Sequence, residues 1–249
     1  MILKSLTKII LFLLINISLT ASLSAQVTLD AESGFVSTGY NDVRIPGNQG
    51  TFLSLKDDLK PSTDIFYRIR LNYTFGSVHT LSLLYAPLSI KSEGQFNRDV
   101  DFAGKLFFAN RDVSGAYKFN SYRLTYRYDF IKNTDFEFGL GFTAKIRDAK
   151  IALSSSGITA EKANVGFVPI INFRLLWKTT DNLGMLLEGD ALAAKQGRAV
   201  DVLLAASYKL SDYLGIKGGY RILEGGADND EVYNFALLQY LSFGVSLTL

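Results

Sequence analysis

The most regular stretch of this chain is residues 122–130, where apolar and polar residues alternate without interruption. Residues two apart share one face of a β-strand, so this pattern predicts a strand with one apolar and one charged face. The apolar face carries Tyr122, Leu124, Tyr126, Tyr128 and Phe130. The opposite face carries Arg123, Thr125, Arg127 and Asp129. At about 3.3 Å per residue and a tilt near 40°, the strand rises about 23 Å, close to the apolar thickness that a membrane-spanning strand must cross.

The same period of two recurs along the chain, and each recurrence predicts another strand. It is clear at residues 67–75, 136–147, 171–175 and 214–222. It is weaker at residues 27–35, 80–88, 185–193, 200–210 and 235–249. With residues 122–130 these segments predict about ten strands, and eight or twelve stay open because the weaker segments can be divided differently.

Short and long connections alternate between these strands. Turn-forming residues occupy residues 75–78, 131–135, 179–182 and 211–213. The connections between them are residues 41–62, 92–114, 154–161, 195–198 and 225–231, of which the first two are long. This order predicts an all-β fold, a transmembrane antiparallel up-and-down β-barrel with tight turns at one rim and loops at the other.

Composition agrees with a barrel that is exported. Residues 1–25 combine Lys4 and Lys8, an apolar run at 9–15 and small residues up to Ala25, which predicts a signal peptide followed by a barrel domain at 26–249. Without those two lysines the 26 basic residues fall to 24, equal to the 24 acidic ones, so no basic surplus favours nucleic acid. The absence of cysteine excludes disulfides and thiolate sites.

Leader, alternation and turn pattern together resemble the small outer-membrane β-barrel proteins of Gram-negative bacteria over nearly all of residues 26–249. The resemblance implies a place in the outer membrane, contact with membrane lipid and lipopolysaccharide, and recognition of the last strand by the outer-membrane insertion machinery. In that last strand Phe243, Val245, Leu247 and Leu249 alternate as expected, but the final residue is leucine where the class usually has an aromatic one.

A soluble periplasmic sandwich or lipocalin-like barrel is the physical alternative, because alternation alone does not say which face is outside. The aromatic content of the apolar face and the unequal connections favour the membrane barrel. An arginine that faced mid-bilayer lipid would cost about 2–4 kcal/mol, so we expect the charged faces to point inward.

This orientation predicts a lumen charge network. Its members are Arg68, Arg70, Arg123, Arg127, Asp129, Glu137, Lys145, Arg147, Arg174, Glu188, Asp190, Asp201, Lys217 and Arg221. Asp30, Glu32 and Lys209 fall on the same face. A lumen of about ten strands is narrow, which favours a network that fills it. A narrow charged pore for ions or small solutes is the alternative, favoured by the inward Gly139, Gly141 and Gly219.

Catalysis finds little support in the sequence. His79 is the only histidine, and it follows the turn at 75–78, whereas enzymes of the class that the chain resembles typically use a histidine at the extracellular rim. Glu188 and Asp190 share one face and suit lumen arginines better than acid–base work. The acidic segment 224–231 lacks the spacing of a calcium loop. We therefore predict no catalytic residue, no metal site and no cofactor.

Three functions stay open. The first is a structural barrel or narrow pore of the cell envelope, and the second is a ligand-binding or adhesion barrel that acts through loops 41–62 and 92–114. The third is a lipid-modifying enzyme or protease. The second loop carries Phe96, Phe102, Phe107 and Phe108, which would either bind a hydrophobic ligand or pack among themselves.

Overall fold

The computed structural model describes residues 25–195 and 197–249, all in strands, turns and loops. The predicted signal peptide falls almost entirely outside the described residues. The barrel strands are β1 (Gln26–Arg44), β4 (Asp64–Phe75), β5 (His79–Ala86), β9 (Asp112–Lys132), β10 (Phe136–Ser155), β11 (Ile158–Lys178), β12 (Leu183–Ala194), β13 (Gly197–Lys209), β14 (Leu214–Asp228) and β15 (Tyr233–Thr248). No helix among these residues is long and apolar enough to cross a membrane.

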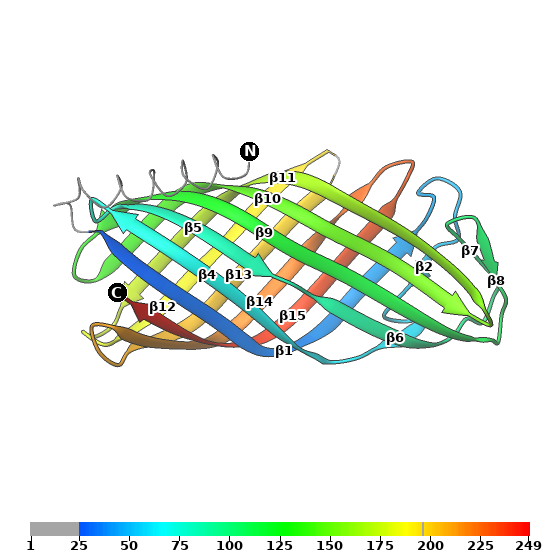
Figure 1. Ribbon diagram of the computed structural model, residues 1–249, viewed down its shortest axis with the longest axis horizontal. Helices are drawn as coiled ribbons and strands as arrows, with labels where there is room; N and C mark the ends of the chain where they lie inside the picture. Colours follow the sequence, from blue (N-terminus) through cyan, green and yellow to red (C-terminus); the bar gives the residue numbers. More distant parts are fainter. Residues whose placement is uncertain (1–24, 196) are drawn as a thin grey trace, which may run out of the picture.

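These ten strands close into an antiparallel barrel. Their order is β10-β11-β12-β13-β14-β15-β1-β4-β5-β9. The barrel closes because β9 pairs with β10, from Ser114 of β9 opposite Ser154 of β10 to Lys132 of β9 opposite Glu137 of β10. Figure 1 shows the strands slanting around the barrel, with the start of β1 and the C-terminus at the same end. The all-β barrel and the count of about ten strands predicted from the alternation are confirmed.

The two rims differ as predicted. Residues 76–78, 133–135, 179–182 and 210–213 make short turns at the rim that holds both ends of the barrel chain. At the other rim, residues 45–63 include β2 (Leu53–Ser54) and β3 (Leu59–Pro61). A second long connection follows β6 (Ser89–Gln95) and carries the hairpin of β7 (Val100–Phe102) and β8 (Lys105–Phe107).

Three predicted connections are shorter than expected. β13 begins inside the predicted connection 195–198, and β14 continues to Asp228, inside the predicted connection 225–231. Residues 154–161 do not form a loop, because β10 and β11 remain paired from Phe136–Trp177 up to Ser155–Ile158. Ser156 and Gly157 alone make the turn, with φ of 48° and 83°. Positive φ at both central residues matches the twist of a two-residue hairpin, so the strands continue without a break. Each is at least 20 residues long, about twice what a membrane requires.

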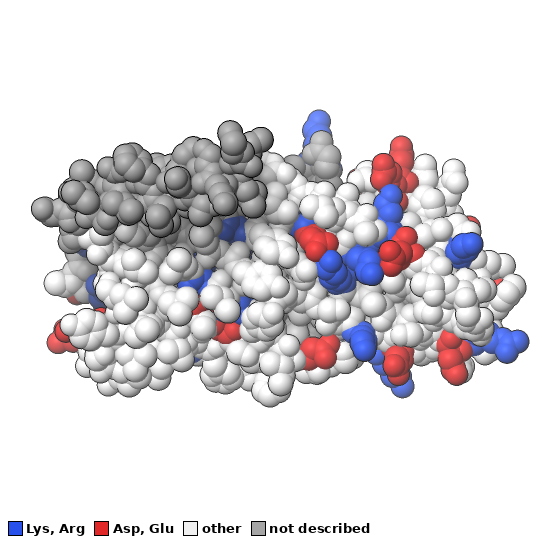
Figure 2. Space-filling model, in the orientation of Figure 1, with Lys and Arg blue, Asp and Glu red and all other residues white. Residues whose placement is uncertain are grey.

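The outer surface shows where the membrane ends. On β9 the predicted apolar face is exposed to the outside, from Tyr122 (42% exposed) to Phe130 (60%). Beyond it the outward residues turn polar, and Lys118 forms an ion pair with Asp148 of β10 at 2.7 Å. Figure 2 shows the same division, because charged side chains lie mainly over the half that carries β6, β7 and β8. That half projects beyond the lipid.

The interior of the projecting half is an apolar core. Leu53, Leu55 and Leu59 come from the first long connection and are at most 1% exposed. Phe96, Phe102 and Phe107 come from the second and are also at most 1% exposed. Strand residues complete the cluster, among them Val36, Tyr117, Leu153, Leu238 and Tyr240. Of the four loop phenylalanines only Phe108 is exposed, at 54%. The two long loops therefore fold inward and cover the barrel at the rim where they lie.

On the side of β12 and β13, the strands extend less far toward the long-loop rim than β10 and β11 do. Pairing between β11 and β12 ends at Ile171–Ala191, although β11 continues to Ile158 and stays paired with β10 throughout. The β12–β13 hairpin ends at Ala194–Gly197. Residues 158–170 of β11 therefore form a strand edge without a neighbour on the β12 side.

Candidate functional site

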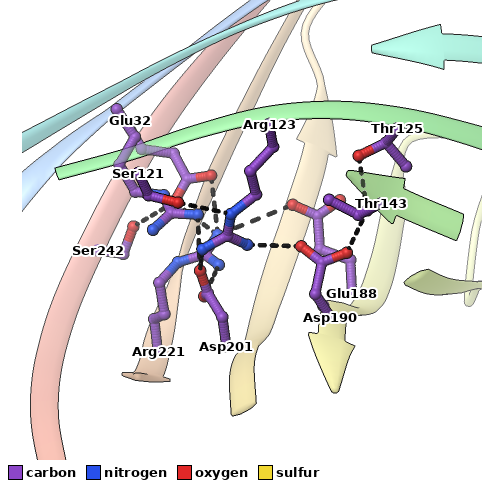
Figure 3. Close-up of polar contacts among 12 residues, drawn as sticks. Glu32, Ser121, Arg123, Thr125, Thr143, Glu188, Asp190, Asp201, Arg221 and Ser242 are labelled. Atoms are coloured by element: carbon purple, nitrogen blue, oxygen red, sulfur yellow. Dashed lines mark hydrogen bonds and ion pairs between the residues drawn. The ribbon is translucent and has the colours of Figure 1, made fainter. Parts of the chain in front are cut away.

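Arg123 of β9 lies at the centre of the barrel. It is 3% exposed and extends across the lumen to carboxylates on the opposite wall, Asp190 of β12 and Asp201 of β13. Its Nε donates a hydrogen bond to Oγ of Ser121 at 2.9 Å. Figure 3 shows its guanidinium between these partners. Inward orientation follows from the alternation on β9, whose other face is apolar and faces lipid.

Asp201 receives three arginines from three strands. Arg68 of β4 lies 3.0 Å away, Arg221 of β14 lies 2.6 Å away and Arg123 donates from β9. All four side chains are at most 4% exposed. Charges removed from water to this degree are stable only when they are paired and hydrogen-bonded. Asp201 is therefore the residue that joins opposite walls of the barrel.

Glu32 of β1 continues the network. Both of its oxygens accept hydrogen bonds from Arg221 at 2.9 Å, and Oγ of Ser242 donates at 3.1 Å. Lys217 of β14 lies 3.1 Å from Glu32, 2.9 Å from Asp30 and 3.5 Å from Glu188. Together these contacts form an unbroken series of ion pairs across the lumen.

Neutral side chains complete the hydrogen bonding of Asp190. Thr143 of β10 donates at 2.7 Å and Nδ2 of Asn172 of β11 donates at 3.0 Å. Thr143 also contacts Thr125 of β9 at 2.7 Å. Reasoning from charge left out these partners as well as Ser121 and Ser242. The signal that could have found them is the same alternation, because each occupies an inward position.

Other predicted lumen residues form smaller groups. Arg127 pairs with Asp129 at 2.9 Å. Nearer the short-turn rim, Glu137 pairs with Arg174 and with Lys178, both at 2.8 Å. Arg70, Lys145 and Arg147 are also on the inward face, but among the described residues none of them has a carboxylate within 4 Å. The fourteen predicted residues therefore do not form one network.

Two of the inward glycines, Gly139 and Gly219, lie close against neighbouring groups. A Cβ atom on Gly139 would lie 2.2 Å from Oδ1 of Asp129 and 2.9 Å from Cδ of Arg127. A Cβ atom on Gly219 would lie 2.6 Å from Cβ of Ala205. Neighbouring groups already occupy the room that these two glycines leave, so the glycines themselves give no support to a pore.

The lone histidine belongs to the lipid-facing surface. His79 begins β5 next to the short turn at 76–78, and its Nδ1 lies 2.8 Å from the hydroxyl of Tyr126. Its ring stacks on Phe75 at 5.1 Å between centroids. Aromatic side chains of this kind gather at membrane–water interfaces. The position is at the rim opposite the long loops and outside the lumen.

The acidic segment 224–231 is divided between separate partners. Glu224 accepts hydrogen bonds from Arg198, at 2.9 and 3.0 Å, and from the hydroxyl of Tyr40. Glu231 lies 2.9 Å from Lys162 of β11. Within residues 25–195 and 197–249, no group of three or more histidine, aspartate or glutamate side chains is arranged to hold a metal ion.

One ion pair connects the two long loops, residues 45–63 and 96–111, to each other. Arg98 of the second connection donates to both oxygens of Asp58 in the first, at 2.9 and 3.0 Å. Partial burial raises the pKa of Asp58, but the hydrogen bonds from Arg98 and from the Ser54 amide outweigh burial, so the pKa lies below its ordinary value. The pair therefore favours the ionised carboxylate.

These features define a closed β-barrel with a lipid-facing belt and a charged lumen. No protein-family model and no curated protein matches the chain. Among solved structures, the outer-membrane protease OmpT of Escherichia coli is 10% identical, with 93% of this chain and 100% of that chain covered and a TM-score of 0.53. The attachment invasion locus protein Ail of Yersinia pestis is 11% identical, with 90% and 99% covered and a TM-score of 0.38. Neisserial surface protein A is 15% identical, with 91% and 99% covered and a TM-score of 0.35.

At these identities the likeness concerns the fold alone. The chain has the fold of the small outer-membrane β-barrel proteins of Gram-negative bacteria, as the resemblance in sequence pattern implied. The belt of exposed apolar side chains around the barrel is a feature of this fold, and such a belt faces the lipid of the outer membrane.

Proposed function

We propose that this protein is a non-conducting structural barrel of the outer membrane, which presents a rigid extension at the cell surface. The observation that carries the proposal is the series of ion pairs from Arg123 through Asp201 and Arg221 to Glu32. It joins β9, β13, β14 and β1, which belong to different sides of the barrel. An ion would have to displace buried, mutually paired charges in order to pass.

The extracellular half supports the same proposal. Loops 41–62 and 92–114 contribute apolar side chains to a sealed core, so the path above the network is blocked by a second, chemically different obstacle. Because most of the aromatic side chains of these loops are internal, the structure offers less support to a binding role for loops 41–62 and 92–114 than the sequence did.

Planar-bilayer conductance of the purified protein tests the proposal. We expect no discrete steps from the wild type in a salt gradient. The double variant Arg123→Ala, Asp201→Ala should conduct only when residues 96–111 are also deleted, because the network and the apolar core are then both opened. Lys150→Gln, on the outward face of β10 and paired with Glu161 at 3.1 Å, is the matched control and should stay silent. Ion-selective steps from the wild type would overturn the proposal.

We also propose that the protein is not an enzyme. The proposal is supported by the place of His79 at the short-turn rim and by the pairing of Glu188 and Asp190 with lumen cations. The variants His79→Ala and Glu188→Gln should leave lipid A and peptide substrates processed as in wild-type membranes. Loss of a processing activity in either folded variant would restore the enzyme hypothesis.

Insertion through the last strand is a further part of the proposal. On β15, Phe243, Val245 and Leu247 are 56%, 49% and 41% exposed and face outward, as a strand read by the insertion machinery would require. Replacing Leu249 with Phe should leave assembly unchanged or increase it, whereas Phe243→Asp should reduce the folded fraction in outer-membrane extracts. Equal folding of Phe243→Asp and wild type would contradict this part.

A further inference from the structure

Three lumen cations have no carboxylate within 4 Å among the described residues, and two of them, Lys145 and Arg147, lie on the same strand, β10. Every carboxylate of the membrane-level lumen has a cation within 4 Å, for example Asp30 with Lys217. Lys145 of β10 has no carboxylate within that distance and no hydrogen bond among the described residues, although it is only 4% exposed. Its Nζ lies over the ring of Phe119, 4.9 Å from the centroid. A buried ammonium without a hydrogen bond or a carboxylate within 4 Å is under-satisfied, because such groups are normally paired.

Arg147 is the second such cation. It follows Lys145 by two residues on the same face of β10, so their Cα atoms are about 7 Å apart. Its guanidinium donates to Oδ1 of Asn164 at 2.7 Å, while its Nε is sealed from solvent without a partner. Glu231, in the connection between β14 and β15, pairs with Lys162 at 2.9 Å. Two positive charges therefore lie side by side, and neither has a carboxylate within 4 Å in the part of the chain that the structure describes.

Arg147 is partly exposed to solvent, whereas Lys145 is 4% exposed. Arg147 pairs in register with Gly166 of β11, in the segment where β11 has lost β12 as a neighbour. Asn164 is exposed although its place in the alternation turns it inward. Leu192 of β12 also points inward and is 39% exposed. The shorter β12 and β13 thus leave the inner face of β10 partly exposed at Arg147.

We propose that Lys145 and Arg147 form a binding site for a compact oxyanion, a phosphate group held between the ammonium and the guanidinium. Arginine matches a phosphate with parallel hydrogen bonds, and lysine supplies a point charge from the other side. Asn164 adds an amide beside the guanidinium. Lys145 pairs in register with Arg123 and Arg147 with Ser121, so the site begins level with Arg123 and extends toward the long-loop rim.

The phosphate has two possible sources. Free phosphate or a phosphorylated solute would arrive from outside the cell. A phosphorylated lipid of the outer leaflet would arrive along the unpaired edge of β11, where Phe167 and Val165 are 62% and 69% exposed and face outward. The shared chemistry is one phosphate group, and the two sources call for separate arms of one experiment.

In the first arm, inorganic phosphate is titrated calorimetrically into the whole protein in an uncharged detergent at constant ionic strength. We expect saturable binding by the wild type and a loss of at least about tenfold in affinity for Lys145→Met and for Arg147→Gln. Lys145→Arg keeps the charge and should retain binding. Lys150→Gln removes a charge from the outward face of the same strand and should bind as the wild type does.

In the second arm, the protein is reconstituted into phosphatidylcholine vesicles with or without phosphatidic acid, and its unfolding temperature is measured. A rise caused by phosphatidic acid in the wild type, and absent in Lys145→Met and Arg147→Gln, identifies a lipid source. Binding in the first arm alone identifies a soluble source. Two results overturn the proposal: no wild-type response in either arm, or the same loss in Lys150→Gln as in Lys145→Met. Heat-dependent gel mobility shows that each variant is folded.

Discussion

The same strands are built in opposite ways in the two halves of this barrel. On β9, residues 121–129 place Arg123 and Asp129 inside and tyrosine and leucine outside, whereas residues 113–119 place Val113 and Tyr117 inside and Lys118 outside. β10 inverts likewise, from inward Lys145 to inward apolar residues near its end. Polarity therefore inverts once along a continuous strand, at the edge of the lipid.

This inversion shows that the solvent decides which face is apolar. In the membrane half lipid surrounds the barrel, so apolar side chains face out and the polar ones must satisfy each other inside. In the projecting half water surrounds it, so the ordinary arrangement of a soluble protein returns. The first half is held by paired charges and the second by hydrophobic burial, and the two should fail under different changes.

The largest effect should come from breaking the network of the membrane half at Asp201. Asp201→Asn leaves Arg68, Arg123 and Arg221 around a neutral group, and removing one partner of buried ion pairs typically costs about 3–5 kcal/mol. Urea unfolding of the reconstituted protein measures the loss. Asp212→Asn is the control, since its ion pair with Lys209 sits at an exposed turn. A loss for Asp201→Asn no larger than the control's would refute the role given to the network.

A change in the apolar core should act on the other half alone. Phe102 is fully buried, and Phe102→Ala should cost about 3 kcal/mol through lost burial and an unfilled cavity. We expect faster protease cleavage within residues 45–63 and 96–111, with the membrane strands still protected. Phe108→Ala, at an exposed neighbouring position, should change nothing. Loss of protection across the whole barrel would mean that the two halves are one cooperative unit.

The position of the inversion can be located with outward arginines on β9. Leu124→Arg places a charge in lipid and should lower the folding stability by about 2 kcal/mol. Ala116 lies on the same outward face of β9, eight residues closer to the long-loop rim, and Ala116→Arg should change the stability by no more than about 0.5 kcal/mol. Folding free energies in lipid vesicles provide the comparison. Equal costs would place the membrane boundary elsewhere.

The smallest effect concerns the charge pair between the loops. Because the pKa of Asp58 is lowered on folding, its contribution is present above the ordinary aspartate pKa and is lost as the pH falls through the folded value. Asp58→Asn should therefore cost about 1 kcal/mol at pH 7 and nothing in strong acid. Protease cleavage of the loops at both pH values measures it, with Asp57→Asn as the adjacent control. A cost that persists in strong acid would rule out the charge as its cause.

The sequence by itself determined the strands, the closed barrel and the inward set of charges. Those features follow from a local period of two and from one requirement, that charged side chains avoid lipid, and both can be evaluated residue by residue. Each of the ten predicted segments falls mainly on one of the ten barrel strands, and Arg123 and Arg127 point inward, at 3% and 8% exposed.

Only the tertiary structure decided which inward residues meet. Arg68 and Asp201 are far apart in the chain, and their contact depends on barrel closure and register, which local alternation does not contain. The same holds for the loops that turn inward and for the room beside Gly139. Likewise, only the structure shows that Lys145 and Arg147 have no carboxylate partner among the described residues, because the ion pairs depend on how the barrel closes.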